Sequence, residues 1–384
     1  MSRSESVPQL ESDAKTQSGV INDLGYAALS PTTPLEPFAF TRRAPGPHEV
    51  LVKIAYCGVC HSDLHASRND WGSTSYPIVP GHEITGHVES VGEAVTKFKV
   101  GDRIGISTYI GTACKDTCDK CTANKHQLCR VGLIKTYNTP IPEPDLTITP
   151  EAMAATHLRT RGGYSSHYVV HEKFAYRLDP RLDMAATAPL LCAGITVYAP
   201  LKRHGAGPGK RVAILGLGGL GHVGAKIAHA MGADTTVISS SPNKVADARR
   251  FGVKVAAAND PETFNRLAKS FDIILNTISA EIDMKKYMPL LDSEGVMVLC
   301  GLPPSLTIPC MPMVTGERKI EGSYVGDISE VQEMLDFCAE HGIGADIEMI
   351  KAEEINTAFE RLERGDVKYR FVIDIATMPK PESK

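Results

Sequence analysis

Residues 211–221 read RVAILGLGGLG, and the rest of the chain is arranged around them. The run 212–215 is apolar and partly β-branched, which predicts a buried parallel strand. An apolar pattern with helical spacing follows at residues 220–231. The stretch therefore predicts a strand, a tight turn and a helix in succession.

Three glycines, Gly216, Gly218 and Gly221, lie between this strand and this helix. In a dinucleotide-binding fold the first makes the turn, the second lets a pyrophosphate approach the backbone, and the third lets helix and strand pack closely. The helix N-terminus adds amide donors for the phosphates. We therefore predict a dinucleotide cofactor here, with an ordinary glycine-rich turn as the alternative.

The position about twenty residues later predicts which cofactor binds. The second strand, expected at residues 235–238, ends at Ser239, where a chain that binds NAD usually carries Asp or Glu. Ser240, Ser241 and Lys244 follow, so hydroxyl groups and one cation stand where a carboxylate would repel a 2′-phosphate. These residues predict NADP(H). The alternative is a serine-rich turn that caps a helix.

Composition and charge exclude several classes of protein. The 384 residues are 42% hydrophobic, and 41 basic residues nearly balance 45 acidic ones. Because neither charge forms a sustained run, we expect neither nucleic acid nor a membrane surface as a partner. No apolar segment has the length of a signal peptide or a membrane span, which predicts a cytoplasmic protein. In that compartment ten cysteines indicate metal ligands or reactive thiols.

The chain divides into regions of different character, which predict an α/β fold. Residues 1–20 are polar and are predicted to be a disordered lead-in. Residues 21–183 are rich in strands and turns, with a long loop at 136–161. Residues 184–326 alternate strands with helices, the pattern of right-handed βαβ units and a doubly wound parallel sheet, and residues 327–384 return to the first domain. Strands are expected at 50–56, 85–91, 211–215, 235–238, 253–256, 271–278, 295–300 and 370–375, and helices at 220–231, 329–341 and 353–364.

Two groups of residues have the chemistry of zinc ligands. Cys60, His61 and His65 lie early in the β-rich region, and His82 and Glu83 follow some twenty residues later. Thiolate, imidazole and carboxylate form the ligand set of a catalytic zinc site, which leaves one position open for water or substrate. The other group is Cys114, Cys118, Cys121 and Cys129, which matches a closed structural zinc site. Cys57 and Cys60 form a competing CxxC pair.

The order of these motifs resembles that of the zinc-dependent medium-chain alcohol dehydrogenases, and within them the cinnamyl alcohol dehydrogenase branch and its fungal NADP-dependent relatives. The resemblance covers residues 26–375. It implies a GroES-like catalytic domain, a Rossmann cofactor domain, a cleft between them and a homodimer. The motifs are CHSDLH at 60–65, VPGHE at 79–83, the four-cysteine lobe at 114–129, LLCAGIT at 190–196, GLGGLG at 216–221 and GDVKYRF at 365–371.

The resemblance also implies two zinc ions per chain and a role for each site residue. Cys60, His82 and Cys192 would hold the catalytic zinc, Glu83 would enter and leave its coordination sphere, and Asp63 would orient the histidine. The four cysteines of the lobe, Cys114, Cys118, Cys121 and Cys129, would hold the structural zinc. Cofactor contacts would fall on Ser62, Thr196, Gly216, Leu217, Gly218, Gly219, Leu220, Gly221, Ser239, Ser240, Ser241, Lys244, Thr277, Gly301, Ser323, Tyr324 and Val325.

The implied reaction is transfer of hydride between NADPH and an aldehyde whose oxygen is polarised by zinc. Ser62 would donate a proton to the alkoxide, and His65 would exchange that proton with solvent. Aromatic, medium-chain aliphatic and natural-product aldehydes all fit as substrates. The alternatives are a secondary-metabolite reductase acting on a C=C bond or an iminium, and a cofactor-binding protein without activity.

Three positions bear on this resemblance. From Cys60, Ser62 is two residues on and His65 is five, which reproduces the spacing of the family, whereas from Cys57 no imidazole falls at the second offset. Three residues separate Cys114 from Cys118 where the family has two, so either the loop bulges or the zinc binds weakly. Lys135 stands where plant members of the branch carry a pocket-lining Trp, which makes plant monolignol aldehydes poor substrate candidates.

Overall fold

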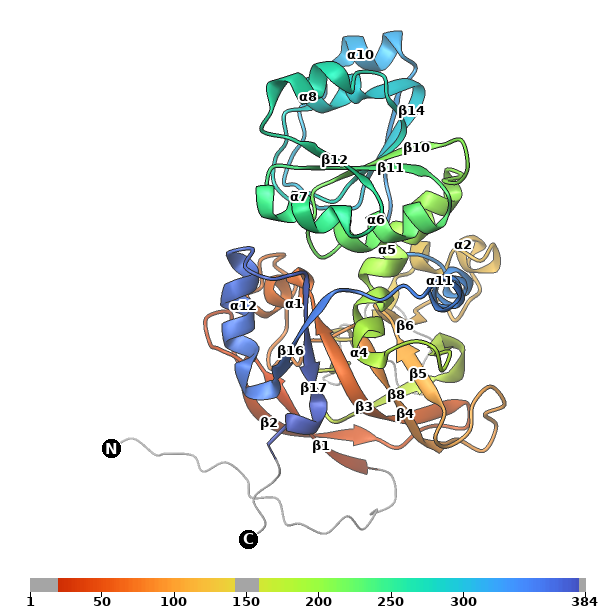
Figure 1. Cartoon of the computed structure of the whole chain (residues 1–384). Helices are drawn as coiled ribbons and strands as arrows, with labels where there is room; N and C mark the ends of the chain where they lie inside the picture. Colours follow the sequence, from red (N-terminus) through yellow and green to blue (C-terminus); the bar gives the residue numbers. More distant parts are fainter. Residues whose placement is uncertain (1–19, 142–158, 380–384) are drawn as a thin grey trace.

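The structure is a computed structural model that describes residues 20–141 and 159–379. Nearly all of the predicted disordered lead-in and the middle of the 136–161 loop lie outside these residues. Two large sheets dominate the described chain. Figure 1 shows the six-stranded sheet in the upper part and the seven-stranded sheet in the lower part, with helix α5 (Ala193–Arg203) between them.

The six-stranded sheet is entirely parallel, in the order β12-β11-β10-β13-β14-β15. The order reverses direction at β10, whose neighbours β11 and β13 lead the chain to opposite sides. The carboxyl ends of strands at such a switch point form the crevice in which α/β proteins bind ligands. The strands are β10 (Arg211–Leu215), β11 (Asp234–Ser239), β12 (Lys254–Ala257), β13 (Phe271–Asn276), β14 (Leu291–Leu299) and β15 (Lys319–Gly322).

Strand β10 is covered on both faces, which explains its unbroken apolar sequence. Val212 and Ile214 belong to one hydrophobic core, and Ala213 and Leu215 belong to a second core on the other face. A strand with only one buried face would alternate between apolar and polar residues. The helices of this half are α6 (Gly221–Ala230), α7 (Pro242–Arg249), α8 (Pro261–Arg266), α9 (Met284–Tyr287) and α10 (Cys310–Thr315), with the 3-10 turn η4 (Met288–Leu290).

The seven-stranded sheet has the order β16-β17-β3-β4-β5-β9, with β8 paired to β3. Strand β17 lies antiparallel to β3, so the last strand of the chain returns to the sheet formed by the β-rich region, as the sequence predicts. Its strands are β3 (Glu49–Val59), β4 (Ile84–Val91), β5 (Arg103–Ile106), β8 (His167–His171), β9 (Ala175–Arg177), β16 (Ile347–Lys351) and β17 (Arg370–Asp374). Two antiparallel two-stranded sheets accompany it, β1 (Val20–Ala27) with β2 (Glu36–Arg43) and β6 (Tyr109–Thr112) with β7 (Leu133–Lys135).

The remaining helices lie around the seven-stranded sheet and beside α5. α4 contacts β3 and β4, whereas α5 packs on α6 and α11. The domain boundaries stay predictions. These elements are α1 (His61–Ser67), α2 (Asp119–Thr122), α4 (Met184–Thr187), α11 (Ile328–His341) and α12 (Ile355–Glu363), with the 3-10 turns η1 (His126–Leu128), η2 (Glu172–Phe174), η3 (Ala188–Leu191), η5 (Ala352–Glu354) and η6 (Ile375–Thr377).

Three strands differ in extent from the expectation by more than one residue. β3 continues to Val59, three residues beyond the expected end. β13 ends at Asn276, because Thr277 and Ile278 turn away into the crevice, and β14 begins at Leu291, four residues early. An irregularity in the pairing of β13 with β14 admits these extra residues. No single helix in the described part of the chain is long and apolar enough to cross a membrane, although the bent pair Met184–Leu191 and Ala193–Arg203 is so when taken together.

Candidate active site

Four possible metal ligands meet where α1, β4 and α5 begin. Cys60 precedes α1, His82 and Glu83 precede β4, and Cys192 lies between η3 and α5. One ligand atom from each residue lies within 4.8 Å of all the others. The structure thus brings together the four residues assigned from the sequence to the catalytic zinc, although they lie as far as 132 positions apart (192 − 60).

The ring of His82 is held in one orientation by Asp63. Its Nδ1 lies 3.2 Å from Oδ1 of Asp63, a fully buried side chain. Oδ1 of Asp63 also accepts the N–H of Gly81 at 3.1 Å, and Oδ2 accepts the N–H of Cys60 at 2.9 Å and the hydroxyl of Tyr164 at 3.0 Å. Burial alone would lower the pKa of His82, but the Asp63 carboxylate outweighs burial and raises it to about 10. Because Nδ1 faces Asp63, Nε2 is the free atom. It is buried and has no hydrogen-bond partner among the described residues.

The two cysteines of the cluster shift each other's pKa in opposite directions. A hydrogen bond from Cys192 lowers the pKa of Cys60 well below its usual value, against the effect of burial, and the charge of Arg370 adds to the shift. The same hydrogen bond raises the pKa of Cys192. Two sulfurs, an imidazole nitrogen and a carboxylate form a ligand set that suits zinc better than the hard cations magnesium and calcium.

Glu83 is positioned by a buried ion pair that the sequence analysis missed. Its Oε1 pairs with Nη2 of Arg370, and both side chains are almost completely buried. Its Oε2 is buried without a partner among the described residues. Gly58 leaves room for this carboxylate, because a Cβ there would lie 2.0 Å from Oε2. Arg370 also runs past Gly219, whose Cβ would lie 2.7 Å from the Arg370 Cδ. The sequence signal for this ion pair was the presence of Arg370 within the GDVKYRF motif.

The predicted proton path begins beside the cluster and ends at the surface. The Ser62 hydroxyl lies 3.7 Å from the Cys60 sulfur. On the same helix, the partly exposed His65 places its Nδ1 2.7 Å from Oδ2 of Asp70. Asp70 was not predicted from the sequence, because a carboxylate five residues beyond a histidine forms no recognisable motif. The loop after α1 brings the two side chains together, and the Asp70 N–H donates to the His65 carbonyl at 3.0 Å.

Cys57 lies outside the cluster. It is fully buried in β3, and its thiol donates weakly to the neighbouring Gly58 carbonyl. The buried ring of Tyr137 lies 5.7 Å from the His82 ring and forms part of the wall of the site, whereas Lys135, two residues earlier, is exposed. The structure therefore places Cys60 at the candidate metal centre and Cys57 in the core of the sheet.

A cavity of about 310 Å³ opens at the carboxyl ends of β10, β11 and β13. It lies at the switch point of the parallel sheet, where a nucleotide is expected. Four of its lining residues, Ile238, Ala258, Ile278 and Tyr287, come from segments without a recognisable motif and were not predicted. The full lining is Gly216, Leu217, Gly218, Ile238, Ser239, Ser240, Ser241, Lys244, Ala258, Thr277, Ile278 and Tyr287.

The glycine turn has the geometry expected of a phosphate-binding turn. Gly216 has φ +85°, a conformation that favours glycine, and a Cβ at Gly221 would lie 2.2 Å from the Gly216 carbonyl oxygen. A Cβ at Gly218 would meet nothing within 4 Å, so this side of the turn is open. Gly219 and Leu220 complete the turn, and Gly221 is the first residue of α6.

The edge of the cavity beyond β11 is polar, and none of its lining residues carries a carboxylate. Ser239 is buried at the end of β11, and its Oγ accepts the N–H of Ser241 at 3.3 Å. Ser240 is exposed, and Lys244 lies in the first turn of α7. On the opposite side Thr277 donates its hydroxyl to the Leu215 carbonyl at 2.7 Å.

Thr196, Gly301 and residues 323–325 do not line this cavity. Thr196 lies on α5, four residues after Cys192. The Thr196 carbonyl on α5 accepts the Cys300 thiol at 3.6 Å, which places Thr196 beside Gly301. The Ser323 N–H donates to the Leu299 carbonyl, and its hydroxyl is buried without a partner among the described residues.

The two residues after Ser323 differ in their exposure. Tyr324 is half exposed, whereas Val325 is buried with φ +37°. A β-branched residue in this region is strained, and such strain often occurs at functional sites.

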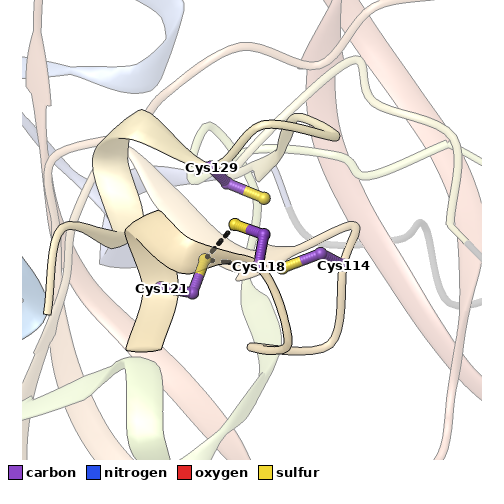
Figure 2. Close-up of side chains that lie close together, drawn as sticks. All are labelled: Cys114, Cys118, Cys121 and Cys129. Atoms are coloured by element: carbon purple, nitrogen blue, oxygen red, sulfur yellow. Dashed lines mark hydrogen bonds between the residues drawn. The ribbon is translucent and has the colours of Figure 1, made fainter. Parts of the chain in front are cut away.

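The four cysteines of the lobe converge between β6 and β7 (Figure 2). Their sulfurs all lie within 4.8 Å of one another, and the Cys121 sulfur is 3.4 Å from Cys114 and 3.6 Å from Cys118. Backbone N–H groups of Arg130 and Cys121 point at the Cys118 sulfur and lower its pKa to about 6. Such donors favour the thiolate, the form that binds a metal.

The extra residue between Cys114 and Cys118 forms a bulge. Lys115 and Asp116 have φ of +50° and +62°, so two successive left-handed residues take up the additional length. Asp116 is held there by the Thr112 hydroxyl at 2.7 Å and by an ion pair with Lys173. The loop therefore bulges, and the strength of zinc binding at this lobe stays a prediction.

The lobe is tied to helix α11 by His126, whose Nδ1 lies 2.6 Å from Oδ1 of Asp327. Asp327 is also the N-cap of α11 and accepts the N–H of Ser329. Figure 1 shows α2 of the lobe beside α11. The lobe therefore supports the helix that begins just after residues 323–325.

Comparison with known proteins covers both halves of the chain. The alcohol dehydrogenase GroES-like domain family matches residues 46–180, and the zinc-binding dehydrogenase family matches residues 219–340. The NADP-dependent alcohol dehydrogenase C 1 of Mycolicibacterium smegmatis is 49% identical over 356 residues, which cover 92% of this chain and 98% of that protein. The aldehyde reductase YahK of Escherichia coli is 47% identical over 356 residues, covering 91% and 97%.

Solved structures show the same relationship. A cinnamyl alcohol dehydrogenase from Sorghum bicolor superposes with a TM-score of 0.86 at 39% identity, covering 94% of this chain and all of that one. The corresponding enzyme from Helicobacter pylori, complexed with NADP(H), superposes with a TM-score of 0.84 at 35% identity and the same coverage.

Proposed function

Because this chain belongs to the zinc-dependent medium-chain alcohol dehydrogenases, we propose that it reduces aldehydes to primary alcohols with NADPH. The observation that carries the proposal is the buried Cys60, His82, Glu83 and Cys192 cluster, in which His82 Nε2 has no partner among the described residues. A buried imidazole nitrogen without a partner is costly unless it binds something. Zinc fits this ligand set, because Asp63 fixes the ring so that Nε2 is available.

We assign Cys60, His82 and Cys192 as ligands of this zinc and Glu83 as a carboxylate that exchanges between the metal and Arg370. The free Oε2 of Glu83 supports this role. When bound, zinc supplies a Lewis acid for the carbonyl oxygen and NADPH supplies the hydride. Ser62 lies beside Cys60 and is assigned as the proton donor. His65 and Asp70, both partly exposed, are assigned as the groups that exchange this proton with solvent.

The preference for NADP(H) is supported by the cavity at the end of β11. Ser239, Ser240, Ser241 and Lys244 line it, and no lining side chain is acidic. An acidic residue there would bind the ribose hydroxyls of NAD and repel a 2′-phosphate. Thr196, Gly301 and residues 323–325 are assigned to the nicotinamide end of the cofactor. The assignment is supported by Thr196, which follows Cys192 by one turn of α5, and by the Cys300 thiol next to Gly301, which donates to the Thr196 carbonyl.

Three further assignments belong to the proposal. A second zinc binds the four lobe cysteines. The protein is a homodimer, which is supported by the exposed Leu302, Met311 and Val314, each 73% accessible, and by β15, which has no further strand beside it among the described residues. It works in the cytoplasm, which is supported by ten cysteines that are all free. A role in secondary metabolism stays a prediction from the sequence.

The test is oxidation of NADPH over a panel of aromatic, aliphatic and terpenoid aldehydes, with an enone and a cyclic iminium added. We expect turnover of aldehydes that disappears in Cys192→Ala. Consumption of NADPH with the enone or iminium alone would favour the C=C or iminium reductase predicted as the alternative.

The cofactor assignment is tested in the same assay. We expect a higher kcat/KM with NADPH than with NADH, and a loss of roughly one to two orders of magnitude in this preference in Lys244→Ala, because a hydrogen bond to a charged group contributes about 1.5–3 kcal/mol. Equal kcat/KM for the two cofactors in the unmodified protein would contradict the assignment.

A further inference from the structure

Asp247 lies one helical turn after Lys244 on α7, the helix that borders the proposed 2′-phosphate site. Residues three apart on a helix are neighbours on its surface. An unpaired carboxylate at this position would attract the Lys244 ammonium and repel a phosphate. An NADP(H) site with Asp247 on this helix therefore requires that its charge be directed elsewhere.

The structure shows where that charge goes. Oδ2 of Asp247 lies 2.9 Å from the Lys368 ammonium and accepts the Tyr369 hydroxyl at 3.0 Å, and Oδ1 lies 3.5 Å from the Arg250 guanidinium. The side chain of Asp247 is only 16% exposed. In the described part of the chain, no carboxylate forms an ion pair with Lys244. Lys244 thus remains available to a ligand.

Tyr369 is itself held rigidly against the cofactor half. Its ring is buried and stacks on His222, with centroids 4.9 Å apart and planes 18° apart. His222 lies in the first turn of α6, and its Nδ1 donates to the Gly218 carbonyl of the glycine turn at 3.0 Å. Tyr369, one of the partners of Asp247, is therefore anchored through His222 to the same turn that forms the cofactor cavity.

We propose that Lys368 and Tyr369 are positioning residues for cofactor specificity, which bind the Asp247 carboxylate and so leave Lys244 free for the 2′-phosphate of NADP(H). Both residues belong to the segment that leads into β17 of the other sheet. The specificity of the cofactor pocket thus depends on a contact from outside the cofactor half. This inference rests on the NADP(H) preference proposed above and names the device that maintains it.

Lys368→Met is the first test, since this side chain is 56% exposed and its loss should leave the fold intact. We expect the ratio of kcat/KM for NADPH to that for NADH to fall by about fivefold, the effect of one charge pair at about 4 Å in water. KM for NADPH should rise while kcat stays constant. Tyr369→Phe should act in the same direction.

Tyr198→Phe is the matched control, because it removes a similar hydrogen bond, from the Tyr198 hydroxyl to Glu333 at 2.8 Å, away from the cavity. We expect no change in the cofactor ratio in this variant. A change equal to that in Tyr369→Phe would show that any lost tyrosine hydroxyl has this effect and would refute the proposal.

The deciding measurement is rescue by Asp247→Asn. If Lys368 acts by binding Asp247, the double variant Lys368→Met with Asp247→Asn should recover the cofactor ratio, because the carboxylate is gone. If Lys368 contacts the phosphate itself, the double variant should not recover, and the proposal is wrong. A preference for NADPH that is unchanged in Lys368→Met would refute this inference alone. No preference in the unmodified protein would refute the cofactor assignment and this inference together.

Discussion

His222 has both ring nitrogens committed to the backbone in its neutral form. Nδ1–H donates to the Gly218 carbonyl at 3.0 Å, and Nε2 accepts the Asp346 N–H at 3.1 Å. A second proton on Nε2 would face a donor. Burial, and after it the charge of Lys226, also disfavour the protonated ring and lower the pKa of His222 to about 4 from its ordinary 6.5.

This shift makes stability depend on pH. Because the pKa is lower in the folded state, the unfolded state binds more protons between pH 6.5 and 4, and stability should fall as pH decreases through this window. The contribution is about 3 kcal/mol at most. Urea unfolding of His222→Gln against the unmodified protein should show a smaller loss of stability between pH 7 and 4. Identical pH dependence in both would show that His222 already titrates normally when folded.

The choice of metal ligand between Cys57 and Cys60 is a second matter decided at single residues. Cys60→Ser should lose the catalytic zinc and nearly all turnover, since its sulfur lies in the cluster. Cys57→Ser should at most lower stability, because that thiol is packed within β3. Ser62→Ala should keep the zinc and lower kcat. Loss of active-site zinc in Cys57→Ser but not in Cys60→Ser would overturn the assignment.

At the scale of elements, the cysteine lobe shows how a local insertion is accommodated. Lys115 and Asp116 adopt left-handed backbone conformations, and the cysteine sulfurs on either side of them still lie within 4.8 Å of one another. The pairing of β6 with β7 closes the base of the lobe. The His126 contact with Asp327 then fixes it against α11. The insertion is therefore compatible with a metal site in which the sulfurs remain close.

We accordingly expect close to two zinc ions per chain by elemental analysis of protein purified without chelator. Cys192→Ala should lose one of them and Cys121→Ser the other, because each variant removes a ligand of a different cluster. Since structural zinc contributes directly to folding, Cys121→Ser should also unfold at a lower temperature. One zinc in the unmodified protein that persists in Cys121→Ser would mean that the lobe is held without metal.

At the scale of the whole molecule, the six-stranded sheet ends in an edge that no other strand of residues 20–141 and 159–379 covers. β15 is its last strand, and Met311 and Val314 on α10 are each 73% exposed. Exposed apolar side chains and unpaired strand edges each mark an interaction surface or an aggregation hazard. A second copy of the chain paired at this edge would cover both features.

Met311→Glu and Val314→Glu should therefore convert a dimer to a monomer in sedimentation velocity, because each places a charge in the proposed interface. Val100→Glu is the control, since Val100 is 62% exposed in the other half of the molecule. An unmodified protein that sediments as a monomer, or variants that all remain dimeric, would place the interface elsewhere or remove it.

Local sequence was sufficient for features that depend on short stretches of chain. The turn at Gly216 requires a positive φ, and the close approach at Gly221 excludes a side chain, so glycine spacing alone indicated the phosphate-binding turn. The donor types of Cys60, His82 and the four lobe cysteines likewise indicated zinc chemistry before any contact was known. These features can be recognised in the sequence because the backbone conformation of a turn and the chemistry of a ligand depend on the residue itself and its nearest neighbours in the chain.

Contacts between distant segments were decided only by the tertiary structure. The pairing of Arg370 with Glu83 spans 287 positions, and that of Tyr369 with Asp247 spans 122. Both depend on the return of β17 to the side of β3, which no periodicity or motif specifies to the accuracy of a hydrogen bond. The sequence thus determined the ligand types, the glycine turn and the parallel sheet. The tertiary structure decided which polar side chains pair with each other, because these pairs form only when the two sheets and the end of the chain pack together.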